Sequence, residues 1–409
     1  MQSAWDPAAA ARAAADAEAA GLPPELGERV YSSRLIGQDA DLTLHGGGNT
    51  SLKLDGVIYV KGSGWDLATI EAPGLPGVRL APLAALEGGT RLSDQEMVAR
   101  LRAELLDPAA PTPSVEALLH AWLPAAVVDH GHCTAVLALA DQPDSAQTVR
   151  AIYGDRLVHV PYVMPGYDLA ELGAKLAAVH PNAEGLWLHQ HGLFTWGATA
   201  QESYERFVDM VTLAEGHLAE HGLAPQGREP RDTALPQPFA DRLAQALAER
   251  CDLGPAPALA FVGTPTLRTL TARPDAAELL SRGTPTPDHV IRIKPFPMFA
   301  DPSDDRATLA GRLDDFAARY RAYFDRHAPS AAEPKVMLDS APRAVVMPGL
   351  GVIGLGRSAR DAGIVADLWE QGARIIAAAE AWGRYTPISE AELFDMEYWS
   401  LEQAKLKNG

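Results

Sequence analysis

Three histidines and one glutamate have the types and spacing that favour metal chemistry. His130 and His132 are separated by one residue at the end of an apolar run, and His191 stands just before Gly192 at the end of another. Side chains alternate along a strand, so the two imidazoles of a His-x-His pair point to the same side. Three neutral imidazoles can hold zinc and leave a fourth position open for a substrate. A His-x-His pair alone is more often structural, so further residues must support this prediction.

Two glycine-rich segments precede the histidines. They read GGGNTS at 46–51 and KGSG at 61–64. Glycines let backbone amides approach an anion closely, and the Asn, Thr and Ser side chains add neutral donors. A tight hairpin turn uses the same residue types, and that alternative stays open. Neither segment is a Walker sequence or a dinucleotide-binding fingerprint.

The segment 114–123, SVEALLHAWL, predicts a helix. Its large apolar residues recur at intervals of three and four, and Pro113 and Ser114 are a start signal. Glu116 is therefore expected in the first turn, with His120 one turn further on the same face. A structural role is favoured for His120.

The elements around these residues alternate between strand and helix. The apolar runs bounded by turn residues indicate strands, and the amphipathic segments indicate helices. An alanine-rich surface helix is expected within 1–26. Strand patterns lie within 42–61 and at 125–128, 157–163 and 185–189, and helices are expected at 133–139, 169–179 and 201–220.

Length and composition restrict the class of protein. With 409 residues and 47% hydrophobic composition, two domains or a domain with a large second lobe are expected. A net charge of -18 argues against nucleic acid or an anionic membrane as partner. The sequence contains no run of about 18 uncharged apolar residues, so no membrane span is expected. Cys133 and Cys251 are too few for a disulfide framework, so a cytoplasmic protein is expected.

The second half of the sequence resembles the first. LGVIGLG at 350–356 is similar to HGLFTWG at 191–197, and DHVIRIK at 288–294 is similar to DGVIYVK at 55–61. These matches predict a shortened, degenerate copy, although chance similarity between ordinary strand-turn-helix units is equally open. Leu350 stands where the first half has His191, so the copy would lack the metal. With a linker at 224–231, the expected domains are 1–225 and 226–409.

Taken together, the motifs resemble those of the class II aldolase and adducin family. GGGNTSLK, VKGSG, PSVEALLHAWLP, VDHGHCTAVLAL and LHQHGLFTWG are similar to its successive blocks. The chain is also similar, through FDMEYWSLEQAKL at 394–406, to the aldolase portion of bacterial fusions of a rhamnulose-1-phosphate aldolase with a short-chain dehydrogenase. It ends at Gly409 without a dehydrogenase segment. The resemblance implies a three-layer α/β/α domain followed by a smaller α/β lobe.

The resemblance also implies a role for each candidate residue. His130, His132 and His191 match the ligands of Zn²⁺ or another divalent metal, and Glu116 matches the acid/base. Val115 departs from the family pattern, which often has a second hydroxyl there, so Lys61 could instead supply a phosphate donor. Tyr153 and Tyr162 are both possible as the family's tyrosine proton donor. The regions that bind substrate phosphate contain Asn49, Thr50, Ser51, Ser63, Gly64 and Ser114.

The implied activity is retro-aldol cleavage of a ketose 1-phosphate, such as rhamnulose 1-phosphate. The products would be dihydroxyacetone phosphate and a small aldehyde, and a homo-oligomer with sites at subunit boundaries is expected. Two alternatives stay open: a metal-dependent epimerase or decarboxylase, and a non-catalytic interaction module of the adducin type. A zinc hydrolase is not favoured, because the sequence has no HExxH motif.

Overall fold

The computed structural model describes residues 1–223, 227, 229–254, 256–401 and 403. The chain divides into two compact units, Met1–Ala224 and Pro225–Gln403. The linker predicted at 224–231 spans this division, and its residues 224–226 and 228 lie outside the described part, as do 402 and 404–406 of the C-terminal motif. In the part of the chain that the structure describes, no helix combines the length and hydropathy that crossing a bilayer requires.

The first unit is built on a seven-stranded mixed sheet with the order β3-β2-β1-β4-β7-β6-β5. Neighbouring strands are antiparallel except for the parallel pair β5 and β6. β4 therefore lies between β1 and β7 in the middle of the sheet. The strands are β1 (Asn49–Leu54), β2 (Val57–Val60), β3 (Gly77–Arg79), β4 (Val127–Gly131), β5 (Leu157–Val160), β6 (Gly185–Leu188) and β7 (Gly192–Gly197).

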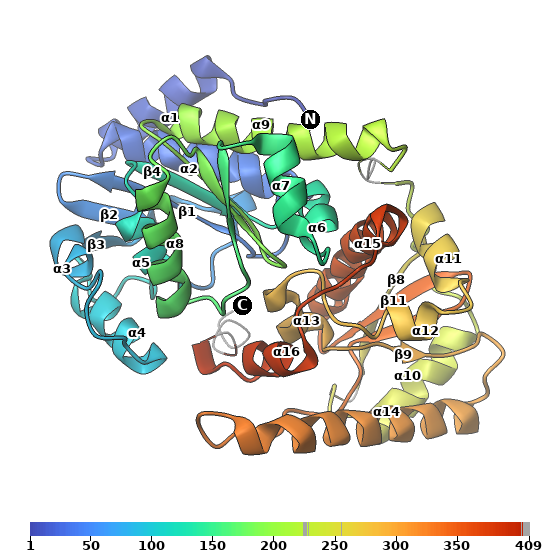
Figure 1. Cartoon of the computed structure of the whole chain (residues 1–409). Coiled ribbons are helices and arrows are strands. Elements are labelled where there is room, and N and C mark those ends of the chain that lie inside the picture. The colour runs from blue at the N-terminus through green and yellow to red at the C-terminus, as the bar shows by residue number, and fades with distance from the viewer. Residues whose placement is uncertain (224–226, 228, 255, 402, 404–409) are drawn as a thin grey trace. The chain divides into compact units, whose positions relative to one another are not determined.

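Helices cover both faces of this sheet (Figure 1). α2, α7 and α9 pack on one face, and α5 and α8 pack on the other. The sequence-based expectation of a three-layer α/β/α domain is confirmed. The helices are α1 (Pro7–Ala19), α2 (Pro24–Gln38), α3 (Leu80–Ala84), α4 (Asp94–Ala103), α5 (Ala117–Trp122), α6 (Thr134–Ala140), α7 (Ser145–Tyr153), α8 (Tyr167–Val179) and α9 (Ala200–Glu220).

One sequence-based expectation for the N-terminal region was wrong, and one helix there was not predicted. The strand pattern starting at Leu42 is a series of turns up to Gly48, because His45, Gly46 and Gly48 have φ values of 47°, 81° and 63°. A strand cannot continue through left-handed backbone, so β1 starts at Asn49. The helix expected within 1–26 is confirmed as α1, whereas α2, which begins at Pro24, was not predicted.

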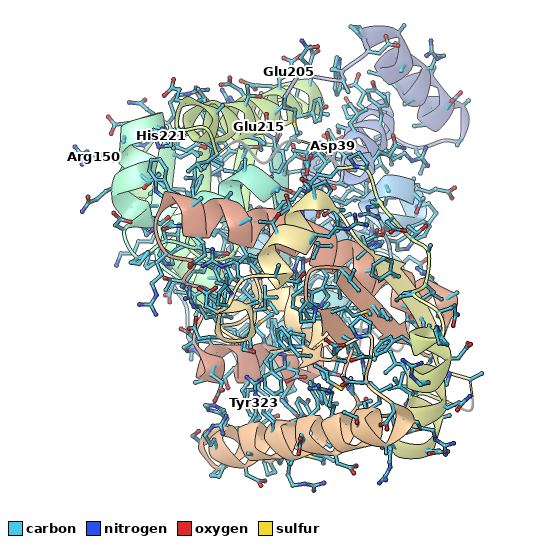
Figure 2. The ribbon with its side chains drawn as sticks, turned by 90° about the vertical axis from the view of Figure 1, so that its right-hand side faces the viewer. Asp39, Arg150, Glu205, Glu215, His221 and Tyr323 are labelled. Atoms are coloured by element: carbon cyan, nitrogen blue, oxygen red, sulfur yellow. The ribbon has the colours of Figure 1, made fainter. Side chains whose placement is uncertain are left out.

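The second unit contains a four-stranded sheet with the order β8-β11-β10-β9. α15 packs on β8 and β11, while α14 packs beside α10. Tyr323 projects from α14 into an aromatic core that includes Phe394 (Figure 2). The strands are β8 (Ala258–Val262), β9 (Met298–Phe299), β10 (Ala344–Met347) and β11 (Gly351–Gly356). The helices are α10 (Phe239–Arg250), α11 (Pro265–Thr271), α12 (Ala276–Leu279), α13 (Val290–Ile293), α14 (Arg306–His327), α15 (Ala359–Trp382) and α16 (Glu390–Glu397).

The strands and helices of the two units correspond in detail. β4 and β8 have five residues each, and each is followed two residues later by a seven-residue helix, α6 or α11. β7 and β11 have six residues each and lead into the long helices α9 and α15, which Thr199 and Ser358 cap in the same way.

The strand pairing extends this correspondence to single residues. Leu193 in β7 pairs with Gly131, and Val352 in β11 pairs with Val262. In this alignment Phe261 and Gly263 take the positions of His130 and His132. Leu350 takes the position of His191, as the sequence comparison indicated.

The match between 288–294 and 55–61 was wrong. Residues 55–61 form a hairpin turn and β2. Residues 288–294 instead lie in a 3₁₀ turn at Pro287–His289 and in α13. Pro287 fits the first turn of a helix, where its missing N–H is not needed. Short apolar runs such as V-I-R-I do not distinguish strand from helix by periodicity alone.

Candidate metal centre

The sheet brings the three candidate histidines together at one end of its central strands. His130 is the fourth residue of β4, His132 follows the strand directly, and His191 lies in the turn between β6 and β7. One ring nitrogen from each lies within 4.8 Å of the others. All three side chains are at least 95% buried. Three residues from two distant parts of the sequence thus form one compact cluster.

The contacts of His130 orient its ring. The backbone carbonyl of Leu193 accepts a hydrogen bond from Nδ1 at 3.0 Å, and the ring stacks on Phe194 with centroids 4.2 Å apart. A proton held on Nδ1 makes Nε2 the ring nitrogen that carries the lone pair, and metal-binding histidines are commonly fixed in this way. Nε2 of His130 therefore faces the other two histidines as a candidate ligand atom.

The cluster fits a divalent ion. The Nε2 atoms of His130 and His132 are 3.2 Å apart. Two nitrogen ligands about 2.0–2.1 Å from a tetrahedral zinc would be about 3.3 Å apart. Oε1 of Glu116 is buried beside the cluster without a hydrogen-bond partner among the residues that the structure describes. The donor set and this carboxylate oxygen match what a cation requires.

Glu116 lies directly against the histidines. It is the residue before α5, 5% exposed, with Oε2 3.5 Å from Nε2 of His130 and Oε1 3.9 Å from Nε2 of His191. The amide of Asn49 donates a hydrogen bond to Oε2 at 2.6 Å. Asn49 and His130 are register partners in β1 and β4, so their side chains share a face of the sheet.

The glycines beside the cluster allow close packing of the backbone. A Cβ on Gly48 would lie 2.5 Å from the carbonyl oxygen of His130, and one on Gly192 would lie 2.5 Å from that of Gly131. Both glycines also have positive φ values, which other residues seldom adopt. The glycine-rich loop therefore packs against the histidine strand, a role that the sequence analysis did not foresee.

Two family models match the sequence. The model of the class II aldolase and adducin N-terminal domain matches residues 28–218, and that of the aldolase class II second domain matches residues 239–406. The chain belongs to the class II aldolase and adducin family. The boundary between the two matches lies near the division between the compact units.

Several individual proteins are similar to this chain. A Bacillus subtilis protein named uncharacterized oxidoreductase YuxG is 32% identical over 419 residues, which cover 95% of this chain and 59% of that protein. The N-terminal class II aldolase domain of a conserved protein from Thermoplasma acidophilum is 36% identical, covers 47% of this chain and 93% of its own, and has a TM-score of 0.45. YgbL from Klebsiella pneumoniae, titled a putative aldolase/epimerase/decarboxylase, is 21% identical, covers 50% and 91%, and has a TM-score of 0.37.

The side chains of the three β1 residues that were expected to bind phosphate point in different directions. Asn49 and Ser51 point toward Glu116 and His120, respectively, on the histidine face. The hydroxyl of Thr50 lies 2.8 Å from Ser33 on the opposite face and is fully buried. The alternation of side chains along β1 explains this difference. The side chain of Thr50 is thus directed away from the cluster.

The other expected phosphate-binding residues lie on two adjoining segments. Gly62 and Pro113 form an isolated β-bridge, and the backbone N–H of Ser114 donates to the carbonyl of Lys61 at 2.9 Å. Ser63 and Ser114 therefore lie on either side of this bridge at half-buried positions, and Gly64 is exposed with a φ of 83°. Nζ of Lys61 is directed to the carbonyl of Gly46 at 3.0 Å.

Of the two tyrosines considered as proton donors, Tyr153 is held by a hydrogen bond within its own unit. Its buried hydroxyl donates to the carbonyl of Met210 in α9 at 2.8 Å, and burial raises the pKa of the phenol. Tyr162 is half-buried after β5. His189 lies outside the triple-histidine cluster, with Nδ1 3.3 Å from Nε2 of His159, whose pKa is lowered by burial.

One buried ion pair was missed by the sequence analysis. Arg29 in α2 contacts Asp129 in β4 at 2.6 Å, and Ser203 in α9 donates to the same carboxylate at 2.6 Å. Asp129 pairs with Thr50 across the strands, so it faces away from His130. In the sequence, this ion pair could have been indicated only by Arg29, which lies in a segment that was not recognised as a helix.

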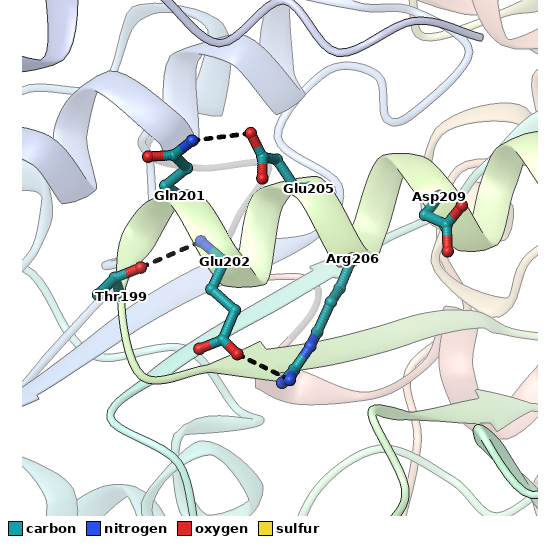
Figure 3. A pocket seen from close by; sticks show the side chains of 6 residues that line it. All are labelled: Thr199, Gln201, Glu202, Glu205, Arg206 and Asp209. Carbon is teal, nitrogen blue, oxygen red and sulfur yellow. Dashed lines mark hydrogen bonds and ion pairs between the residues drawn. The ribbon is translucent and has the colours of Figure 1, made fainter. Parts of the chain in front are cut away.

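A surface hollow along α9 is a separate feature (Figure 3). Several of its polar groups are paired with each other, since Arg206 contacts Glu202 at 2.7 Å and Gln201 donates to Glu205 at 2.9 Å. None of the residues of the histidine cluster lines it. The lining residues are Thr199, Gln201, Glu202, Glu205, Arg206 and Asp209.

Proposed function

We propose that this class II aldolase family member is a metal-dependent carbon–carbon lyase that cleaves a ketose 1-phosphate resembling rhamnulose 1-phosphate. The products are dihydroxyacetone phosphate and a small aldehyde. The observation that carries the proposal is the Glu116 carboxylate, buried within 3.9 Å of the nitrogens of His130 and His191. An acid/base beside a Lewis-acid site is the combination that retro-aldol chemistry needs without a Schiff-base lysine.

In this proposal His130, His132 and His191 hold Zn²⁺ or another divalent ion. When bound, the ion supplies Lewis acidity toward the carbonyl and the adjacent hydroxyl of the sugar. Glu116 moves the proton as the carbon–carbon bond breaks, because Oε1 is left without a hydrogen-bond partner in the described part of the chain. Asn49 holds the other oxygen of this carboxylate.

The substrate phosphate is assigned to the adjoining segments that carry Ser63, Gly64 and Ser114. Their half-buried or exposed positions leave the hydroxyls of Ser63 and Ser114 within reach of a ligand, as an anion site requires. Thr50 has no part in this assignment, because its hydroxyl contacts Ser33. Ser51 is not assigned to the phosphate either, because its hydroxyl lies 2.8 Å from Nδ1 of His120.

The second domain, 226–409, is proposed as a degenerate copy that binds no metal. Phe261, Gly263 and Leu350 occupy the positions that correspond to the three histidines, and none offers a ligand atom from its side chain. The conserved order of strands and helices supports duplication, as does the shared capping of α9 and α15. A role in shaping a homo-oligomer is the function that we assign to it.

The test is a metal-dependence assay on the full chain. The purified protein is stripped with a chelator, reloaded with zinc or other divalent ions, and assayed with rhamnulose, fuculose and ribulose 1-phosphates. Cleavage is expected only in the metal-loaded protein, with stoichiometric release of dihydroxyacetone phosphate. Parallel assays for epimers of ketose 5-phosphates and for carbon dioxide from keto-acid phosphates test the alternative reactions. Undiminished cleavage by the stripped protein would rule out the metal.

The carboxylate is tested separately by Glu116→Gln. The substitution keeps the shape of the side chain and removes its ability to take a proton. We expect a loss of about 10²-fold or more in kcat with bound zinc unchanged. An unimpaired variant would show that Glu116 is not the acid/base.

A further inference from the structure

A continuous hydrogen-bond chain reaches Glu116 from the interior of the first unit. The Glu116 carboxylate accepts from the Asn49 amide at 2.6 Å, and the oxygen of that amide makes a short hydrogen bond with Nε2 of His120. The other nitrogen of His120, Nδ1, lies 2.8 Å from Oγ of Ser51. His120 and Ser51 are fully buried, and Asn49 is 5% exposed.

The chemistry of the groups fixes the direction of every hydrogen bond in this chain. An ionised carboxylate only accepts, so the nitrogen of the Asn49 amide must face Glu116 and its oxygen must face His120. That oxygen also only accepts, so Nε2 of His120 must carry the proton. In the neutral ring Nδ1 is then an acceptor, and the hydroxyl of Ser51 donates to it.

The surroundings of His120 keep it neutral. Full burial lowers the pKa of His120 well below its usual value. A neutral imidazole with both nitrogens hydrogen-bonded satisfies the rule that buried polar groups find partners. Its ring also packs edge-on against Phe194, with centroids 5.4 Å apart.

Each link of this chain comes from a regular element. Glu116 directly precedes α5 and His120 lies four residues later within it, while Asn49 and Ser51 are alternate residues of β1. The helix and the strand therefore present two side chains each at matching spacing. Glu116 receives no capping hydrogen bond on its own helix, so the Asn49 amide is the contact that holds its carboxylate.

We propose that His120 is a positioning residue for catalysis, which locks the Asn49 amide so that its N–H is always presented to Glu116. Without His120 the amide can rotate and present its oxygen to the carboxylate, which would repel Glu116 from its place beside the histidines. Ser51 completes the lock by fixing the tautomer of His120. The inference rests on the acid/base role proposed for Glu116.

The structural part of the inference is tested by a readout that needs no activity. In protein labelled with ¹⁵N-histidine, the signal of His120 is assigned by its loss in His120→Gln. We expect the neutral tautomer protonated on Nε2 in both metal-free and zinc-loaded protein. The signal should shift in Asn49→Ala and stay in place in Ser145→Ala, which removes a buried acceptor of Trp187 elsewhere in the unit. A ring protonated on Nδ1, or one that does not respond to Asn49→Ala, overturns the proposal.

The catalytic part is tested by the pair His120→Leu and His120→Gln. Glutamine can both donate to Asn49 and accept from Ser51, whereas leucine can do neither. We expect full zinc content in both, a loss of about 10- to 100-fold in kcat for His120→Leu with KM little changed, and partial recovery in His120→Gln. In a Glu116→Gln background, His120→Leu should cause no further loss.

Equal activity of His120→Leu and wild type, or a loss that persists in full when Glu116 is already Gln, would contradict the proposal. Ser145→Ala shows how much activity is lost when an unrelated buried hydrogen bond is removed. If wild-type protein cleaves no ketose 1-phosphate, the proposed function fails. The tautomer measurement still decides whether His120 locks Asn49.

Discussion

Nη2 of Arg29 and Oδ1 of Asp129 lie 2.6 Å apart, and neither side chain is accessible to solvent. Asp129 immediately precedes His130, and the two side chains leave β4 on opposite faces of the sheet. The pair therefore ties α2 to the strand that carries the candidate metal ligands. It contributes no ligand itself, but its loss would disturb the strand that does.

Arg29→Met should lower the free energy of unfolding by about 3–5 kcal/mol, because it leaves the Asp129 carboxylate buried without its counter-charge. The measurement is denaturant unfolding followed by tryptophan fluorescence. In Arg29→Met combined with Asp129→Leu, most of this loss should be recovered. Arg91→Met is the control, since the Arg91–Asp168 pair is exposed and should contribute less than about 1 kcal/mol. Similar effects at the two arginines would refute the prediction.

The three histidines predict one zinc ion per chain. His191→Asn should reduce bound zinc strongly, because it removes one of three ligands, whereas His189→Asn should retain it, because His189 contacts His159 instead. Metal analysis of the purified variants provides the measurement. A content near two ions per chain would show that the second domain also binds metal.

The phosphate assignment predicts a change in KM without a change in kcat. Ser63→Ala should raise KM for a ketose 1-phosphate about tenfold or more, as expected for a lost hydrogen bond to a charged group. Inorganic phosphate should inhibit the wild type competitively and the variant more weakly. Thr69→Ala, which removes an exposed hydroxyl from the same unit, serves as the control. An unchanged KM would place the phosphate elsewhere.

Asp141 predicts a dependence of stability on pH. Burial raises the pKa of this carboxyl well above its usual value, and neither oxygen has a hydrogen-bond partner in the described ranges. The folded protein therefore keeps this proton at pH values where the unfolded chain has lost it. Its contribution to stability falls as the pH rises above about 4.

Asp141→Asn removes this titration and should raise the thermal midpoint at pH 7.5 relative to wild type. The difference should narrow as the pH is lowered toward 4. Thermal unfolding at several pH values measures both, with the exposed carboxylate of Asp155 replaced by Asn as the control. A difference that does not vary with pH would contradict the prediction.

Much of the first unit could be predicted from the sequence because local patterns determine it. The strand at Gly185 and the helix at Ala200 were predicted to within one residue of their observed starts. The proximity of Glu116 to the three histidines came from the family resemblance, since no local pattern relates residues in α5, β4 and the turn before β7.

The features that the sequence analysis missed depend on long-range contacts. The role of Gly48 follows from the carbonyl of His130 beside it, and the burial of Arg29 follows from Asp129, 100 residues away in sequence. By contrast, the direction of Thr50 could have been deduced from strand alternation, because it lies between Asn49 and Ser51. The helix at 290–293 could not be deduced, because a segment of four residues carries too little periodicity.

The central position of β4 determines how the candidate centre can assemble. Hydrogen bonds of the sheet, rather than a metal ion, hold β1, β4 and β7 in register, and the side chains at Asn49, His130 and Phe194 follow from that register. The backbone that carries the candidate metal ligands is thus ordered during folding, so its loss of conformational entropy does not oppose metal binding. Unlike a zinc finger, which remains unfolded until its ion binds, this protein would be synthesised with a ready-made receptor for its cofactor.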